Sequence, residues 1–311
     1  MRIMVTGAAG FIGSHVAEAY LAAGHQVLVI DNLTSGRRAN IPARAGFEEM
    51  DIRDRRLGDV CRRFQPQVVC HHAAQIDVRK SVTDPMFDAE VNVVGTLNLL
   101  EAARAAGAER FIFASSGGAI YGEQEDVPAT ETHALSPISP YGVSKLAAEK
   151  YLYYYRAVHG LSYVALRYAN VYGPRQDPFG EAGVVAIFAS KLLGNERPII
   201  NGDGLQTRDY VYVADVARAN LLALAPGVEG VFNIGTGRET GVVTLFEELQ
   251  RLTGQEGNSP HGPAKAGEQR RSVLDATLAA RTLGWRSEVG LAEGLKATVE
   301  YFRQGEGARS R

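Results

Sequence analysis

A tyrosine and a lysine stand four residues apart in the stretch YGVSK, as Tyr141 and Lys145. The preceding SPISP is a turn signal, and residues 141–158 have the apolar spacing of an amphipathic helix. Side chains at positions i and i+4 share one helix face, about 5 to 6 Å apart at Cβ, so an ammonium group can lie beside a phenol. Such a pair could carry out proton transfer, but the same spacing is also common on ordinary helix surfaces. Other parts of the sequence have to decide between these two interpretations.

The second chemical pattern is GAAGFIG, which places Gly7, Gly10 and Gly13 between an apolar run and a helical pattern. Glycines in that context allow a tight turn and let backbone N–H groups at a helix N-terminus approach a pyrophosphate. The next apolar run, QVLVI, leads into Asp31, close to the spacing of about 20 residues at which an acid binds the adenosine ribose. The order strand, turn, helix, strand, acid predicts a dinucleotide site, against the alternative of a glycine-rich turn with a capping aspartate.

The acidic residues near this turn indicate which dinucleotide is bound. Asp31 would repel a 2′-phosphate, which favours NAD over NADP, although Arg37 and Arg38 leave NADP open because an arginine can accommodate that phosphate. Asp51, in MDIRD, ends the third apolar run and could accept a hydrogen bond from the adenine amino group. An equally good interpretation is that Asp51 caps a helix.

The elements that must position these residues follow an alternating pattern. Residues 2–167 contain six short apolar runs separated by helical patterns, namely RIMVT, QVLVID, GFEEMD, QVVCHH, RFIFASS and SYVALRY. This alternation predicts an α/β fold with a doubly wound parallel sheet of the Rossmann type. Longer Gly- and Pro-rich loops after residue 167 indicate a smaller, interleaved α/β domain that binds the substrate. We expect residues 1–167 and about 209–238 in the dinucleotide domain, and residues 168–208 and about 239–311 in the other.

Composition excludes several other classes of protein. The net charge is −2 and the arginines are scattered, which argues against nucleic-acid binding. No apolar run approaches the ~20 residues of a membrane span, and the sequence after Met1 enters a strand pattern directly, so we expect a cytoplasmic protein with no membrane contact. Cys61 and Cys70 lack the spacing of metal ligands and are expected to be buried, inert thiols. No metal site is predicted.

The chemical patterns together resemble one family. Ser115 and Ser116 end the fifth apolar run, at the sheet edge where ligands of open α/β sheets bind, and the Tyr141–Lys145 helix follows them. With the glycine-rich turn, this set resembles the extended short-chain dehydrogenase/reductase family. The resemblance covers nearly the whole chain, through the motifs TGAAGFIGSH, DNLTSG, DIRD, HHAAQ, NVVGTLNLLEAAR, YGVSK, LRYANVYGPRQ and GDGLQTRDYVYVADVA.

The resemblance implies roles for the residues at the centre of the site. Tyr141 takes the place of the catalytic base, Lys145 that of its modulator, and Asn92 that of a helix residue that supports the site. Ser116 matches the hydroxyl that binds the sugar 4-oxygen, with Ser115 as the alternative because SSGGAIYG is one residue longer than usual. A free phenol has a pKa of about 10, and the lysine and the cationic nicotinamide are expected to lower it together.

The resemblance also implies a set of ligand contacts. The residues expected along the cofactor NAD are Gly7, Gly10, Phe11, Ile12, Gly13, Asp31, Asn32, Asp51, Ile52, Ala73, Ala74, Tyr141, Lys145 and Tyr168.

On the substrate side, Asn170 and Arg208 are expected to contact a diphosphate, and Lys265 and Glu268 to hold phosphate and ribose. Lys265 stands where the family usually has arginine, so the charge is kept without the bidentate fork. Arg208 has a structural alternative, pairing with Asp209 or Asp215.

Ser272 matches a position beside the sugar. Its small side chain would leave room for a 2-acetamido group.

Within the family the chain is most similar to the UDP-hexose 4-epimerases. This implies interconversion of UDP-galactose and UDP-glucose through a transient 4-keto sugar and bound NADH, with the N-acetylhexosamine pair as candidate further substrates. The segments YLYYYRAVHG and NVVGTLNLLEAARAAG resemble the helices of a homodimer interface.

Three alternatives stay open. The first is another NAD(P)-dependent nucleotide-sugar oxidoreductase or decarboxylase of the same fold, and the second is a non-catalytic dinucleotide sensor. The third is a dehydratase, which the sequence disfavours because Gly117 and Gly118 stand where such enzymes carry an acidic pair.

Overall fold

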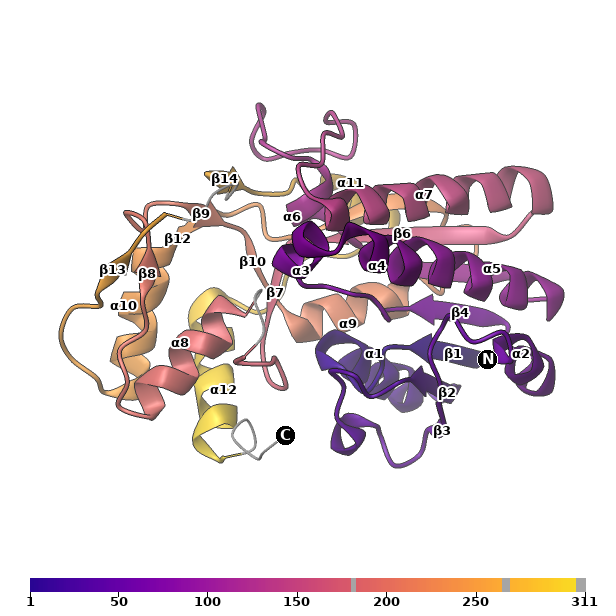
Figure 1. Cartoon of the computed structure of the whole chain (residues 1–311), viewed down its shortest axis with the longest axis horizontal. Helices are drawn as coiled ribbons and strands as arrows, with labels where there is room; N and C mark the ends of the chain where they lie inside the picture. Colours follow the sequence, from indigo (N-terminus) through magenta and orange to yellow (C-terminus); the bar gives the residue numbers. More distant parts are fainter. Residues whose placement is uncertain (180–182, 265–268, 306–311) are drawn as a thin grey trace.

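A seven-stranded parallel sheet forms the centre of the molecule in a computed structural model that describes residues 1–179, 183–264 and 269–305 (Figure 1). The strand order is β11-β6-β5-β4-β1-β2-β3. The strands are β1 (Arg2–Thr6), β2 (Gln26–Asp31), β3 (Gly46–Glu49), β4 (Val68–His71), β5 (Arg110–Ser116), β6 (Ser162–Tyr168) and β11 (Gly230–Ile234). The order reverses beside β1, so a crevice for a ligand is expected at the carboxyl ends of β1 and β4.

Helices cover both faces of the sheet, which explains why the strand sequences are almost continuously apolar. One face carries α1 (Phe11–Ala22), α9 (Val213–Leu222) and α11 (Thr277–Thr282), and the other carries α2 (Leu57–Phe64), α5 (Gly95–Ala105) and α7 (Pro140–His159). Alternate residues of one strand enter the two cores, since Ile3 and Val5 pack with α1 whereas Met4 packs with α2. The sheet is therefore buried on both faces.

The segment between β4 and α5 contains three short helical pieces. α3 (Val78–Thr83) and α4 (Pro85–Ala89) are each capped by an aspartate, and α4 continues through a π-helical turn, η2 (Glu90–Val94), into α5. A single π-helical turn inside a helix widens it locally and frequently occurs at functional sites. Two other short pieces are η1 (Arg38–Asn40) and α6 (Gly117–Ile120).

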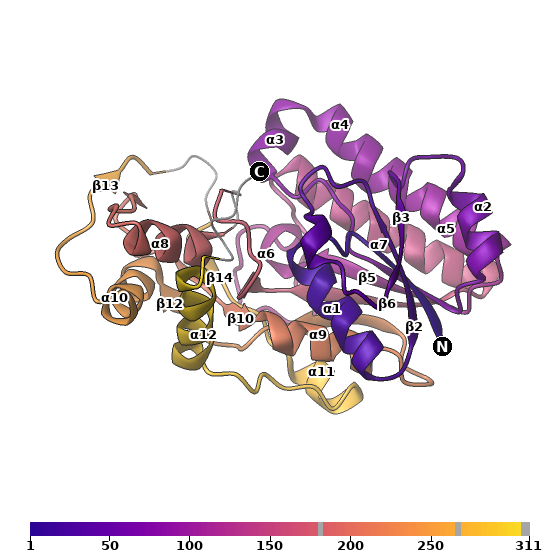
Figure 2. The same ribbon diagram turned by 90° about the horizontal axis from the view of Figure 1, so that it is seen from below.

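A smaller lobe lies beside the carboxyl end of the sheet, on the left of Figure 1 and again in Figure 2. Its helices α8 (Val184–Leu193), α10 (Val242–Thr253) and α12 (Leu291–Arg303) share a separate apolar core. Its short strands are β7 (Asn170–Tyr172), β8 (Ile200–Asn201), β9 (Thr207–Arg208), β10 (Tyr210–Tyr212), β12 (Thr240–Gly241), β13 (His261–Gly262) and β14 (Arg271–Ser272). Between them the chain returns to the main sheet as α9 and β11, so the two parts are interleaved in sequence.

The predicted α/β fold with a doubly wound parallel sheet is confirmed, and each of the six apolar runs contains a strand. The residue ranges given to the two domains stay a prediction. One finding bears on them: Ala279, Leu283 and Trp285 belong to the core under the main sheet, with the Trp285 indole donating to the Asp215 carbonyl. None of the helices in the described part of the chain is long and apolar enough to cross a membrane.

Candidate active site

The glycine-rich turn between β1 and α1 is closely packed and has no room for side chains. Gly7 has φ +72°, and a Cβ there would lie 2.5 Å from the Ala73 nitrogen. A Cβ at Gly13 would lie 2.5 Å from the Gly7 carbonyl oxygen, and one at Gly10 3.1 Å from it. Gly10 is the N-cap of α1 and has no side chain that could cap the helix. The first backbone N–H groups of α1 therefore have no side-chain acceptor at the N-cap and can bind a ligand in the crevice. Such a turn fits a pyrophosphate.

Asp31 lies at the end of β2, next to this turn. Its carboxylate accepts hydrogen bonds from the backbone nitrogens of Ala9 (3.0 Å) and Leu33 (2.9 Å), and burial raises its pKa. Two oxygens have about four acceptor sites, so the carboxylate can still accept ribose hydroxyls. Arg38, considered above as a partner for a 2′-phosphate, instead lies 3.5 Å from Glu49 and over the Phe47 ring.

Asp51 follows β3 and has several partners within the chain. It accepts from the Arg53 guanidinium, from the Arg53 backbone nitrogen and from the Asn32 amide, and the Arg53 hydrogen bond holds its pKa at about 2. Asp51 is not a helix cap, because its carboxylate accepts from the Arg53 nitrogen in a local turn, whereas the N-cap of α2 is Arg56. Its contact with adenine stays a prediction.

The other residues expected along the cofactor surround the same crevice. Ile52 is buried against Gly95, Ala73 donates its backbone N–H to Thr6, and Ala74 follows it. Tyr168 is buried at the end of β6, where its hydroxyl accepts from the Asn220 amide at 2.8 Å. Phe11 and Ile12 open α1. Their contacts with a cofactor stay predictions.

Tyr141 stands at the start of α7, where three features fix the chain. Ser139 caps the helix by accepting from the Gly142 nitrogen, Pro140 occupies the first turn, and the Tyr141 backbone N–H donates to Ser81 on α3. Proline is favoured at that position because it has no N–H to leave unpaired. The tyrosine is therefore held by its backbone before its side chain makes any contact.

The Tyr141 phenol has Ser116 as its hydrogen-bonding partner. Burial raises the pKa of Tyr141 to about 12, while the hydrogen bond with Ser116 acts to lower it and the charge of Asp88 to raise it. The Lys145 ammonium lies 5.8 Å from the centre of the Tyr141 ring. The sequence predicts that the lysine and the nicotinamide lower this pKa together. The chain's own groups hold the phenol neutral, so the lowering has to come with the cofactor.

Lys145 lies one helical turn further along α7 and is buried. Its Nζ donates to the Ala114 carbonyl of β5 at 2.9 Å and lies 4.8 Å from the centre of the Phe113 ring. Burial lowers its pKa to about 8, against the opposing charges of Asp88 and then Glu149. A lysine with this pKa carries a proton at neutral pH but can release it readily.

Ser115 and Ser116 point to different environments, which decides between the two candidate hydroxyls. Ser115 is buried and donates to Glu149 at 2.6 Å, whereas Ser116 is partly exposed beside Tyr141. Glu149 also binds Arg167 through two hydrogen bonds, at 2.6 and 3.0 Å, and Arg167 donates to the Tyr121 hydroxyl. We call Ser115, Tyr121, Glu149 and Arg167 the Glu149 cluster. The geometry therefore favours Ser116 over Ser115 as the hydroxyl that hydrogen-bonds the Tyr141 phenol.

Asn92 lies in the π-helical turn and joins a second buried group of polar residues. Its side chain accepts from the Gln75 nitrogen and donates to the Gln75 carbonyl, both at 2.8 Å, and donates to Asp88 at 3.0 Å. Asp88 also accepts from the Gln75 amide (3.0 Å) and from Ser144 of α7 (2.6 Å). We call Gln75, Asp88, Asn92 and Ser144 the Asp88 cluster.

The residues expected to bind substrate lie on short strands of the second lobe. Arg208 on β9 is opposite Ser272 on β14, and Asn170 on β7 is opposite Tyr210 on β10. The Asn170 amide oxygen is 3.9 Å from the position of a Cβ on Gly118, which brings Asn170 to the turn after Ser116. The structure thus brings Asn170 next to the reacting groups.

The two aspartates considered as structural partners of Arg208 both have other donors. Asp209 accepts from Thr236, Gly237 and Leu274, and Asp215 accepts from Arg218 and from backbone nitrogens after Trp285. Arg208 donates to the Thr207 carbonyl. Lys265 and Glu268, the other two expected ligands, lie outside the described residues.

Sequence reasoning missed Asp88, Gln75, Ser81 and Ser144. Asp88 could have been found, because it precedes Asn92 by four residues and therefore shares its helix face. Gln75, Ser81 and Ser144 come close to it only through the tertiary fold, and no local pattern marks them.

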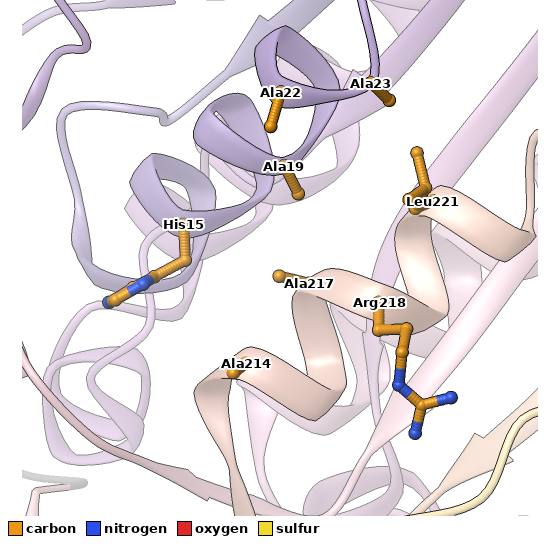
Figure 3. A pocket seen from close by; sticks show the side chains of 8 residues that line it. All are labelled: His15, Ala19, Ala22, Ala23, Ala214, Ala217, Arg218 and Leu221. Atoms are coloured by element: carbon orange, nitrogen blue, oxygen red, sulfur yellow. The ribbon is translucent and has the colours of Figure 1, made fainter. Parts of the chain in front are cut away.

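A shallow hollow of about 510 Å³ lies between α1 and α9 (Figure 3). Alanines line most of it, with His15 and Arg218 at its edges and Leu221 beside them. His15 is held by Pro174 and Arg175, and burial lowers its pKa to about 4. None of the residues discussed above as reacting or ligand-binding groups lines this hollow, so we do not assign the chemistry to it.

Comparison with known proteins agrees with this geometry. The profile of the NAD dependent epimerase/dehydratase family matches residues 3–235. The UDP-glucose 4-epimerase of Mycolicibacterium smegmatis is 47% identical over 309 residues, which cover 97% of this chain and 99% of that protein. The chain belongs to the NAD-dependent epimerase/dehydratase family.

Two solved structures add detail. The Thermotoga maritima UDP-glucose 4-epimerase, solved with UDP-glucose, is 50% identical with a TM-score of 0.97, over 98% of this chain and 100% of that one. The Thermus thermophilus UDP-glucose 4-epimerase, solved with NAD, is 47% identical with a TM-score of 0.92, over 97% and 99% of the two chains. The resemblance seen in the sequence and the choice of NAD are both confirmed.

Proposed function

We propose that this protein is an NAD-dependent UDP-glucose 4-epimerase that interconverts UDP-galactose and UDP-glucose. The observation that carries the proposal is the grouping of Ser116, Tyr141 and Lys145 at the carboxyl edge of the sheet, next to a turn shaped for a pyrophosphate. Relatives named for the same activity match over nearly the full chain at 47 to 50% identity.

The first chemical task falls to Tyr141. When bound, NAD supplies reversible hydride transfer at carbon 4 of the sugar, and its pyrophosphate would be held by Gly7, Gly10 and Gly13. The Tyr141 oxygen removes the proton of the 4-hydroxyl as carbon 4 is oxidised, and returns it when the carbonyl is reduced. Because the chain alone holds the pKa of Tyr141 near 12, the phenol ionises only once a further positive charge lies beside it.

Ser116 and Lys145 prepare that proton transfer. The Ser116 hydroxyl binds Tyr141 and is placed to bind the sugar 4-oxygen as well, which fixes the direction of the transfer. Lys145 is fixed by the Ala114 carbonyl, so its charge stays close to the phenol. Epimerisation further requires the keto sugar to present its other face, which a firmly bound diphosphate and a loosely held hexose would allow.

A dehydratase is the second candidate, and the packing after Ser116 disfavours it. A Cβ at Gly117 would lie 2.4 Å from the Leu274 side chain, so a carboxylate cannot be placed there without moving Leu274. Within the described residues, the turn Gly117–Gly118 thus carries no acid for eliminating water. Simple oxidation and return of the hydride remains the better fit.

The N-acetylhexosamine pair is a further candidate substrate. Ser272 is small and lies buried on β14, directly opposite Arg208, the residue expected to contact the diphosphate, which supports a place for it near the substrate. A Ser272→Tyr variant should lose turnover of UDP-N-acetylgalactosamine more than that of UDP-galactose. An unchanged ratio of the two rates would refute this role.

We also propose a homodimer formed through α5 and α7. Val94 is exposed just before α5, and α7 carries exposed apolar side chains along its outer face, namely Val143, Tyr151, Tyr153, Tyr154 and Val158. A Val158→Glu variant should shift the sedimentation coefficient to that of a monomer, and a wild-type monomer would refute the proposal. The cytoplasmic location stays a prediction.

The function is tested with UDP-galactose as the only reagent. The purified protein should contain NAD and convert UDP-galactose to UDP-glucose, followed by NMR, without added cofactor. Turnover that needs added NAD(P) and releases the reduced cofactor would indicate an oxidoreductase instead. Bound NAD with no turnover of any nucleotide sugar would favour the sensor.

A further inference from the structure

Asp88 is a buried carboxylate for which the reaction described above has no role. It lies on α4 with 0% of its surface exposed, immediately before the π-helical turn. Its Oδ1 accepts from the amides of Gln75 and Asn92, each at 3.0 Å, and its Oδ2 accepts from the Ser144 hydroxyl at 2.6 Å. A buried carboxylate requires such partners, since an unsatisfied one is strongly destabilising.

The three donors come from three different parts of the fold. Gln75 follows β4, Asn92 lies in η2, and Ser144 lies on α7 between Tyr141 and Lys145. The hydrogen bond to Ser144 is short, as expected when the acceptor is ionised. Asp88 therefore connects the segment that bears the reacting groups to the wall of the site on the other side.

All three donors are electrically neutral, so no contact of Asp88 with the residues that the structure describes cancels its charge. This charge acts on the reacting groups: it raises the pKa of Tyr141 and, ahead of Glu149, that of Lys145. The other titratable groups facing Lys145 are His71 at the end of β4 and His72 directly after it; burial lowers the pKa values of both, to about 3 for His72. Both imidazoles are neutral at pH 7, which leaves Asp88 and Glu149 as the charges opposite Lys145.

We propose that Asp88 is a positioning residue for the epimerisation, which binds α7 through Ser144 and sets one fixed negative charge beside Tyr141 and Lys145. The proposal rests on the proposed function, because it assigns a task within that reaction. The hydrogen bonds of Asp88 go to Gln75, Asn92 and Ser144. Asp88 therefore acts on Tyr141 and Lys145 through Ser144 and through its charge.

The first test is an Asp88→Asn variant, which keeps the shape and can keep all three hydrogen bonds if the Ser144 hydroxyl turns. Removing the charge lowers the pKa of both Tyr141 and Lys145, so the pH optimum of kcat should move to lower pH. A residue with only a structural role would leave the optimum in place. The wild-type optimum in a folded Asp88→Asn protein would overturn the proposal.

The second test removes the contact itself. Asp88→Ala should lower kcat by about 10- to 100-fold with little change in KM, because small displacements of reacting groups have effects of that size. Ser144→Ala should lower kcat less, and adding it to Asp88→Ala should cause no further loss, since both remove the same link. Full additivity of the two effects would contradict the proposed link.

Asp84→Asn is the matched control. Asp84 lies on the same segment, is exposed, and caps α4 by accepting from the Phe87 nitrogen, a task that asparagine performs equally well. This variant removes one negative charge four residues away and should leave kcat and its pH optimum unchanged. Equal NAD content and melting temperature in the wild type and both Asn variants exclude a folding defect.

A readout without turnover separates this proposal from the proposed function. The pKa of Tyr141 is obtained by absorbance titration, as the difference between each protein and its Tyr141→Phe counterpart. It should be lower in Asp88→Asn than in the wild type. If the wild type fails to epimerise, the proposed function is wrong while this titration still decides whether Asp88 acts on Tyr141; equal values in both proteins would overturn it.

Discussion

Two buried carboxylates, Asp88 on α4 and Glu149 on α7, have different partners. Glu149 is bound by the Arg167 guanidinium and Ser115, so its charge is paired within the Glu149 cluster. Asp88 is bound only by the neutral donors Gln75, Asn92 and Ser144 among the described residues. The charge of Glu149 is largely cancelled by Arg167, whereas the charge of Asp88 is not cancelled by its donors and acts on Tyr141 and Lys145.

The cations of the two regions differ in the same way. Arg167 has its pKa raised by its hydrogen bonds with Glu149, against the opposing effect of burial. Lys145 has its pKa lowered to about 8 because burial outweighs the charges of Asp88 and Glu149. A buried cation beside an opposite charge has its charge compensated, whereas an incompletely paired one opposes folding and is typical of reactive sites. This difference separates a structural polar cluster from a reactive one.

The strongest test of the reactive region is Tyr141→Phe. Removing the phenol oxygen removes the proton acceptor, so we expect kcat to fall by about 10²- to 10⁴-fold, the usual contribution of a general base. UDP-galactose turnover followed by NMR measures this, and the NAD content of the purified protein should stay at its wild-type value. Wild-type turnover in this variant would remove Tyr141 from the mechanism.

Arg167→Met breaks the paired region. It leaves the Glu149 carboxylate buried without its partner, and we expect the free energy of unfolding to fall by about 3 to 5 kcal/mol in urea denaturation. The double variant Glu149→Met with Arg167→Met should recover much of that loss, because no unpaired charge remains. A single variant as stable as the wild type would show that the pair contributes nothing.

Replacing Lys145 by methionine should have the opposite effect on stability from Arg167→Met. The pKa of Lys145 falls from 10.5 to about 8 on folding, so the buried charge opposes folding at pH 7. Since one pKa unit is worth about 1.4 kcal/mol, Lys145→Met should raise the free energy of unfolding by about 3 kcal/mol while kcat falls.

The pH dependence of stability gives a check on the sign. Between about pH 8 and 10.5 the unfolded chain keeps the Lys145 proton and the folded chain loses it. Wild-type stability should therefore rise relative to that of Lys145→Met across this window as the pH increases. A constant difference between the two proteins would show that Lys145 has an ordinary pKa.

The sequence predicts the sheet and the reacting groups for a physical reason. Strands buried on both faces are continuous apolar runs, and the glycine-rich turn and the Tyr141–Lys145 pair are local patterns, so all of these can be read along the chain. The two clusters cannot be read in this way. Glu149 contacts Arg167 only when β6 packs against α7. Asp88 contacts Ser144 only when α4 packs against α7. The raised pKa of Tyr141 follows from burial in the packed fold, which the i+4 spacing does not reveal.

The smallest effects concern Ser115 and Ser116, adjacent residues that belong to the two regions. Ser115→Ala removes one hydrogen bond to the charged Glu149, and we expect a loss of about 1.5 to 3 kcal/mol in the free energy of unfolding with kcat per folded site unchanged. Ser116→Ala should show the reverse, with little change in stability and kcat lowered by about 10-fold, because one hydrogen bond in the transition state is worth about that factor. Measuring both quantities for both variants makes each the control for the other. If Ser115→Ala lost the activity instead, the longer turn of SSGGAIYG would have shifted the reacting hydroxyl by one residue, and the Glu149 cluster would belong to the active site.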